Sequence, residues 1–174
     1  MRLHRVSQWT ETKQAWGLLF ATALFVLGCA LYFQLALGLE PCVKCVYQRL
    51  AMFGIGLAAL LGYVGHRMAS LRGMALLLWL VSAGWGFYIA NDHAQMQLAA
   101  NAFFAVCDAH PSFPSWAPLH EWIPMLFAAP GLCGDIDWQF LGLSMPMWMQ
   151  IIFAVYFFTA ALVLVLRLFR LRRL

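Results

Sequence analysis

Two cysteines separated by two residues, Cys42 and Cys45, stand just before an arginine, Arg49, in this chain of 174 residues. Two thiols at this spacing can close a strained disulfide that exchanges readily with other thiols. The pair lies where a polar loop enters a long apolar stretch at 46–64. Thiols at the mouth of a membrane helix indicate electron transfer between a water-facing thiol and an acceptor dissolved in lipid. Because side chains cannot serve as the terminal acceptor of two electrons, such a route also predicts a cofactor.

The position of Cys45 predicts a reactive sulfur. A helix that begins near Cys45 presents unpaired N–H groups and the positive end of its dipole, which favour a thiolate. Arg49 follows four residues later on the same helical face and adds a positive charge one turn deeper. We expect Arg49 to stabilise the thiolate and to polarise an oxygen of a quinone. The alternative is that Arg49 only extends to lipid headgroups.

The chain has three further cysteines besides Cys42 and Cys45. Cys107 and Cys133 fall in a second polar segment, and Cys29 lies within the first apolar run. Four polar-segment cysteines allow three pairings. Cys42–Cys45 with Cys107–Cys133 is the simplest static arrangement, and a transient disulfide between the segments is also expected. Cys29 is predicted to pack as a small apolar side chain.

Other chemistries of a Cys-x-x-Cys pair fit less well. Attachment of a c-type haem requires histidine directly after the second cysteine, where this chain has Val46. A structural zinc site normally uses two closely spaced cysteine pairs, and positions 107 and 133 are far apart. A thioredoxin-type site requires strands alternating with helices, which the sequence does not indicate. No metal site is therefore predicted.

The composition indicates a membrane protein. Hydrophobic residues make up 64% of the chain and charged residues 10%, against about 45–50% and about 25% in soluble domains. Four apolar runs, at about 15–33, 46–64, 73–90 and 147–166, each approach the ~20 residues that cross a bilayer as a helix. We predict an all-α integral membrane protein with one domain, residues 1–174, built as a four-transmembrane-helix bundle. The first run is interpreted as a retained helix because it is longer than a signal-peptide core.

The basic residues predict the topology. Nine of the 11 Lys and Arg residues fall on one side, before the first run, between the second and third runs, and after the fourth. The segment 91–146 contains no Lys or Arg. Both termini are therefore expected in the cytoplasm, with outward loops at about 34–45 and 91–146. The basic pI follows from this distribution, so no nucleic-acid partner is predicted.

The second outward loop contains a short apolar segment at 119–127 that includes Trp122. We predict a short interfacial helix there, anchored by tryptophan on the membrane surface. The alternative is a packed turn of the loop. Prolines distributed through this loop argue against long regular elements.

The chain resembles the bacterial disulfide bond formation protein B (DsbB) family over essentially its whole length. The resemblance is carried by the four spans, by the loop cysteines Cys107 and Cys133, and by these motifs: Pro41-Cys42-x-x-Cys45-x-Tyr47-x-Arg49, Trp116-x-Pro118-Leu119, Trp122-x-Pro124, Phe140-Leu141-Gly142-Leu143 and Met145-Pro146-x-Trp148.

The resemblance implies an enzyme of the bacterial inner membrane that reoxidises a periplasmic DsbA-type thiol oxidase. The partner's cysteine would attack Cys107 of a Cys107–Cys133 disulfide, and the freed Cys133 would attack Cys42. Cys45 would leave as a thiolate facing a membrane quinone, ubiquinone or menaquinone, which Arg49 would hold. The cysteine loops would be periplasmic.

The resemblance also implies a helpful histidine just beyond the third span, which corresponds to His93. Its alternative interpretation is a solvated loop histidine. Some family members carry an acidic residue where this chain has Gln48, and we expect activity to survive this difference.

Three competing functions remain open. A non-catalytic four-span assembly or structural protein would hold two static disulfides, which would resist a reduced dithiol. A metal-binding protein would use the cysteines with His93, His110 and His120, and metal analysis would reveal it. Oxidoreduction of a small molecule, as in vitamin K epoxide reductases, usually comes with an additional thioredoxin-like domain.

Overall fold

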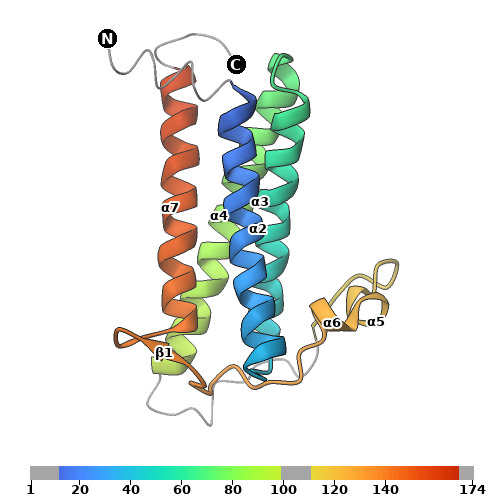
Figure 1. Ribbon diagram of the computed structural model, residues 1–174, viewed down its shortest axis with the longest axis vertical. Helices are drawn as coiled ribbons and strands as arrows, with labels where there is room; N and C mark the ends of the chain where they lie inside the picture. The colour runs from blue at the N-terminus through green and yellow to red at the C-terminus, as the bar shows by residue number, and fades with distance from the viewer. Residues whose placement is uncertain (1–11, 99–110, 169–174) are drawn as a thin grey trace.

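The computed structural model describes residues 12–98 and 111–168, and four long helices run side by side through it (Figure 1). They are α2 (Lys13–Ala36), α3 (Val43–Val64), α4 (Ala69–Leu98) and α7 (Met145–Leu166). Each is long and apolar enough to cross a membrane. The prediction of an all-α, four-span membrane protein is confirmed, and the chain is a multi-pass membrane protein.

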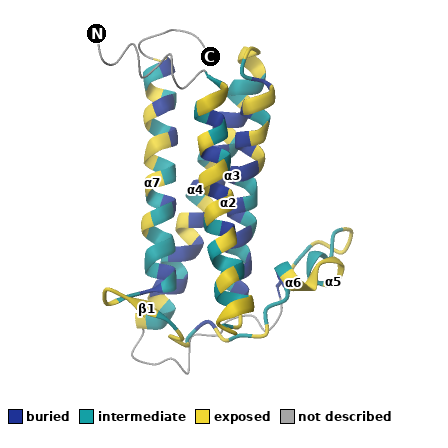
Figure 2. Cartoon of the chain, in the orientation of Figure 1, coloured by how far each residue is buried: buried dark blue, intermediate teal, exposed yellow. Residues whose placement is uncertain are grey.

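The order of packing places α3 and α4 at the centre of the bundle. α3 packs against α2 on one side and α4 on the other, and α4 also packs against α7. Exposed residues lie on the outer faces of the helices, as Figure 2 shows. Many of them are large apolar residues, so this surface suits lipid rather than water. Close helix contacts come from small buried side chains, as is usual between membrane helices: Ala23, Ala51, Ala58, Ala59, Ala75, Ala83, Ala90 and Ala160.

At the end of the bundle that carries Cys42, all four helices extend beyond the predicted spans, and α4 does so by the most. α3 begins at Val43 rather than at residue 46, with Cys42 as its N-cap. α4 continues past residue 90 to Leu98. The segment 91–98 is too polar to count as a membrane span, yet it contains no proline or glycine that would end the helix. His93 therefore lies within a helix, and the interpretation as a solvated loop histidine is wrong.

The predicted single helix at 119–127 is two short helices. These are α5 (Leu119–Trp122) and α6 (Pro124–Phe127), which lie to the side of the bundle in Figure 1. They break at Ile123, whose φ of −136° and ψ of 69° are not helical. Pro124 causes the break, because the residue before a proline is pushed towards extended conformations. The location of this segment on the membrane surface stays a prediction.

A small β-hairpin before α7 was not predicted from the sequence. Its strands β1 (Gln139–Phe140) and β2 (Leu143–Ser144) pair antiparallel. Both residues of its two-residue turn, Leu141 and Gly142, have positive φ, at 52° and 77°. This is the geometry that matches the twist of a hairpin. The Trp148 indole N–H donates to the Phe140 carbonyl at 3.1 Å and attaches the hairpin to α7.

Gly86 allows α4 and α7 to approach closely. A Cβ at this position would collide with the ring of Phe153, which is fully buried. We expect Gly86→Ala to lower the free energy of unfolding by about 1–3 kcal/mol, because the packed ring has no space to move into. Gly73→Ala in the same helix is the matched control, since no described atom lies within 4 Å of its added Cβ. Thermal unfolding in detergent measures both; equal midpoints would contradict the prediction.

Candidate active site

The N-terminus of α3 brings the two thiols of the Cys-x-x-Cys pair into contact. Cys42 and Cys45 are free cysteines whose Sγ atoms are 2.8 Å apart. The backbone N–H of Cys45 donates to the Cys42 Sγ at 3.3 Å, so the sulfur itself caps the helix. Cys42 ends the loop and Cys45 lies in the first turn of α3. The two residues are therefore about one helical turn apart, which brings their sulfurs together.

The two sulfurs differ in environment. The hydrogen bond to Cys45, together with burial, raises the pKa of Cys42 well above its ordinary value. The proton shared by the pair is therefore held by Cys42. When one thiol ionises, the negative charge resides on Cys45, where the unpaired N–H groups of the helix N-terminus favour it. This asymmetry makes Cys45 the sulfur that is suited to leave during thiol–disulfide exchange.

Arg49 lies one turn further along α3 and is buried, with 7% of its surface exposed. Its Nη1 donates to the Gln34 Oε1 at 2.7 Å and to the Leu126 carbonyl at 3.2 Å, and its Nη2 donates to the Ala30 carbonyl at 3.4 Å. Within the described part of the chain no carboxylate forms an ion pair with it. A guanidinium has five N–H donors, so donors remain for a bound acceptor. These contacts disagree with the interpretation that Arg49 extends to headgroups.

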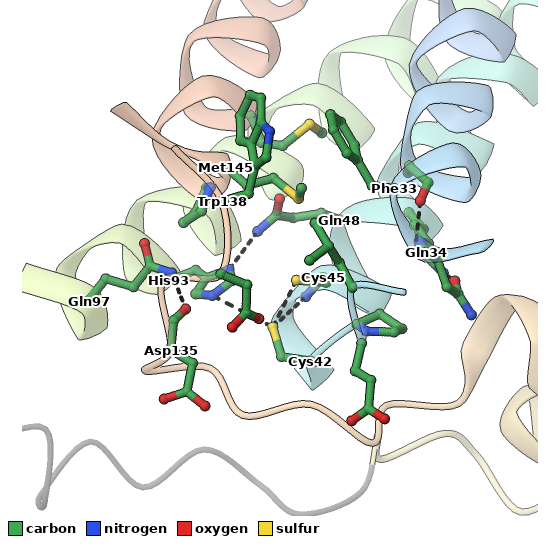
Figure 3. A pocket seen from close by; sticks show the side chains of 18 of the residues that line it. Phe33, Gln34, Cys42, Cys45, Gln48, His93, Gln97, Asp135, Trp138 and Met145 are labelled. Carbon is green, nitrogen blue, oxygen red and sulfur yellow. Dashed lines mark hydrogen bonds between the residues drawn. The ribbon is translucent and has the colours of Figure 1, made fainter. Parts of the chain in front are cut away.

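His93 of α4 faces the cysteines, as Figure 3 shows. Its Nε2 lies 3.6 Å from the Cys42 Sγ and donates to the Cys133 carbonyl at 3.1 Å. Its Nδ1 lies 3.3 Å from the Gln48 Nε2, which donates to it in this tautomer. Gln48 and His93 are both buried. A single imidazole thus contacts residues of both outward segments.

The second outward segment is held directly against the first. The Gly131 N–H donates to the Pro41 carbonyl at 3.1 Å, and the Gln97 side chain donates to the Asp135 carbonyl at 2.9 Å. Cys133 lies between these two attachments, is disulfide-bonded and is 1% exposed. Lys44 forms an ion pair with Asp92, which joins the start of α3 to α4. Cys133 is therefore positioned beside the Cys-x-x-Cys pair.

Gly131 is required for this close approach, because a Cβ there would collide with the Glu40 carbonyl. We expect Gly131→Ala to displace the Cys133 segment and to slow disulfide exchange with Cys42 at least about tenfold, since small displacements of reacting atoms are costly. The rate can be followed by rapid quenching and thiol alkylation. Gly134→Ala is the control, since no described atom lies within 4 Å of its added Cβ. Equal exchange rates in the two variants would contradict the prediction.

A cavity of about 100 Å³ lies between α2 and α7 and reaches both Cys45 and Arg49. Its walls are mostly apolar, and the indole of Trp138 covers one side with its ring centroid 5.0 Å from that of Phe33. Several lining residues were not predicted from the sequence, because they come together only through the packing of segments that are far apart in the chain: Phe33, Gln34, Trp138, Met145 and Met149.

The structure brings together most of the residues predicted for the site. Cys42, Cys45, Arg49 and His93 line this cavity, and Cys133 contacts His93. Cys107 lies outside the described residues. Cys29 is a half-buried free thiol of α2 that does not line the cavity, in agreement with a packing role.

Comparisons with known proteins identify a family for this chain. The family described as disulfide bond formation protein DsbB matches residues 12–163. A curated relative from Idiomarina loihiensis, named disulfide bond formation protein B, is 59% identical over 86% of this chain and 82% of its own length. Relatives of the same name from Pseudoalteromonas atlantica and Vibrio parahaemolyticus are 50% and 40% identical. They cover 87% and 97% of this chain, and 88% and 94% of their own lengths.

Proposed function

Since the chain belongs to the DsbB family of disulfide bond formation proteins, we propose that it oxidises a periplasmic DsbA-type thiol oxidase and transfers the electrons to a membrane quinone. Disulfide formation by a membrane oxidoreductase follows from the family. The observation that carries the proposal of a quinone acceptor is the cavity lined by both Cys45 and the buried guanidinium of Arg49.

The proposed route uses two disulfides in series. Cys133 is disulfide-bonded, whereas Cys29, Cys42 and Cys45 are free. The proposed route takes Cys107 as the partner of Cys133 in this disulfide, as the family resemblance implies. The reduced partner's thiolate attacks Cys107, and the second partner thiol then completes the partner's disulfide, which leaves Cys107 and Cys133 as thiols. Two electrons have entered the chain.

The second exchange moves these electrons to the Cys42–Cys45 pair at the N-terminus of α3. The Cys133 thiolate attacks the Sγ of Cys42 in a Cys42–Cys45 disulfide, and Cys45 departs as a thiolate. Closure of the Cys107–Cys133 disulfide then returns Cys42 to its thiol form. Contacts of His93 with the Cys42 sulfur and the Cys133 carbonyl support this step, because they hold the two residues side by side. The pair is then a dithiol that carries two electrons and two protons.

The cavity residues fit a quinone. Apolar walls suit its ring, the remaining N–H donors of Arg49 suit a carbonyl oxygen, and the thiolate position of Cys45 faces the same space. A quinone bound there, ubiquinone or menaquinone, supplies a two-electron, two-proton acceptor. Arg49 would bind and orient it, and the apolar walls would exclude water while the Cys42–Cys45 disulfide re-forms.

We place the protein in the bacterial inner membrane with both termini in the cytoplasm. Positively charged residues at one end of the bundle support this orientation, because Lys13 begins α2, Arg67 lies between α3 and α4, and Arg167 follows α7. The opposite end, which carries Cys42, Cys45 and Cys133, would then face the oxidising periplasm.

The test is anaerobic quinone reduction by the detergent-purified protein, driven by a reduced DsbA-type protein and followed by quinone absorbance. We expect multiple turnovers and a matching loss of partner thiols. If the parent protein reduces no quinone and its disulfides resist the reduced partner, the chain is the non-catalytic protein with static disulfides.

A further inference from the structure

The reduced site contains three metal-ligating side chains in one cluster. The Sγ atoms of Cys42 and Cys45 and an imidazole nitrogen of His93 lie within 4.8 Å of one another. Cys42 is 2% exposed and His93 is 3% exposed, whereas Cys45 is half-buried and lines the cavity. Two thiolates and one imidazole are the donor set that zinc uses in three-ligand sites with an open fourth position.

We propose that the dithiol form of this site binds Zn²⁺ through Cys42, Cys45 and His93, and that the disulfide form does not. Binding displaces the two thiol protons and transfers no electrons. Two thiolates neutralise the dication, so the occupied site carries no net charge into its apolar surroundings. In the disulfide each sulfur is bonded to the other and is no longer a thiolate ligand, which makes binding depend on the redox state.

The geometry needs only a small adjustment. Zinc lies about 2.3 Å from sulfur and about 2.0–2.1 Å from nitrogen, so tetrahedral ligand atoms are roughly 3.4–3.8 Å apart. The Cys42 Sγ is 3.6 Å from the His93 Nε2, which already meets this spacing, whereas the two sulfurs are 2.8 Å apart. Rotation of one cysteine side chain widens the sulfur pair by the required distance of about 1 Å. The fourth position faces the cavity that Cys45 and His93 line, where water can occupy it.

Gln48 supports the tautomer that the metal requires. His93 now donates from Nε2 to the Cys133 carbonyl, so ligation by Nε2 moves the ring proton to Nδ1. The Gln48 side-chain amide lies 3.3 Å from Nδ1, and an amide can present its oxygen to an N–H as well as its NH₂ to a lone pair. Gln48 can therefore act as the outer hydrogen-bond partner that orients a ligating histidine.

The consequence for turnover rests on the proposed function. A metal bound to both thiolates prevents the Cys42–Cys45 disulfide from re-forming, so Zn²⁺ would hold the enzyme in its reduced form. Inhibition would then be strongest when the quinone is scarce, because the dithiol form accumulates under that condition.

The test uses Co²⁺ as a spectroscopic probe of the full-length, detergent-purified protein, reduced and kept anaerobic after removal of the reductant. We expect one Co²⁺ per chain with sulfur-to-cobalt charge-transfer absorption that Zn²⁺ abolishes by competition. Cys45→Ser should lose this absorption, and His93→Gln should weaken cobalt binding at least about tenfold. Cys29→Ser and His120→Gln are the matched controls, because neither residue belongs to the cluster, and both should bind as the parent does.

Three results would overturn the proposal: absorption that persists in Cys45→Ser, absorption in the oxidised parent, or no absorption in a parent whose thiols are fully reduced. The measurement requires neither a quinone nor the partner protein. Failure of the metal site and failure of the proposed electron route are therefore observed in separate assays.

Discussion

Substitution of Cys45 by serine is expected to lower sustained quinone reduction by more than about 1,000-fold, the scale of loss when a reacting residue is removed. A serine hydroxyl cannot form a disulfide with Cys42, so the second exchange has no leaving sulfur. The disulfide at Cys133 is untouched and should still oxidise about one equivalent of reduced partner per chain. Quinone absorbance and partner thiols, measured in the same anaerobic reaction, give both quantities.

Oxidation of one equivalent of partner by Cys45→Ser shows that the variant is folded. This measurement therefore distinguishes a blocked electron route from a misfolded protein. Cys29→Ser is the matched control, because Cys29 is a free thiol of α2 that does not line the cavity. It should turn over within about twofold of the parent, as expected of a substitution away from the reacting groups. Sustained quinone reduction by Cys45→Ser would show that electrons leave by another route.

The Arg49→Ala variant is expected to raise the quinone KM roughly 10- to 100-fold, because a hydrogen bond from a charged donor contributes about 1.5–3 kcal/mol. The KM for the reduced partner should change little, since the proposed route has the partner react at the second outward segment. Steady-state kinetics with each substrate varied in turn separates the two constants.

Arg49→Lys is the control variant that retains the positive charge. It loses the planar fork that contacts Gln34, Leu126 and Ala30, so we expect an intermediate quinone KM. Arg49 also connects α2 with the segment around α6 through these hydrogen bonds, so its substitution could affect folding. Oxidation of one equivalent of partner by each variant shows that the variant is folded. An unchanged quinone KM in Arg49→Ala would exclude the proposed role.

Several features could be predicted because their causes are local in the chain. The spans follow from apolar runs of the length that a bilayer requires, and all four helices were located. Cys42, Cys45 and Arg49 lie within three turns of one helix, so their common face follows from helical geometry. The end of α4 was not predicted, because its polar residues are satisfied by tertiary contacts: His93 is buried against Cys42 and Cys133.

Helical periodicity and hydropathy act over short distances, so the amino-acid pattern alone predicts which helices form and places Cys42, Cys45 and Arg49 together at the N-terminus of α3. Only the tertiary structure decided what surrounds this N-terminus. Gln34, Trp138 and Gly131 approach Cys45, Arg49 and the first loop from distant parts of the chain. Their approach depends on how helices and loops pack, and packing is set by shape complementarity between whole elements rather than by any local pattern.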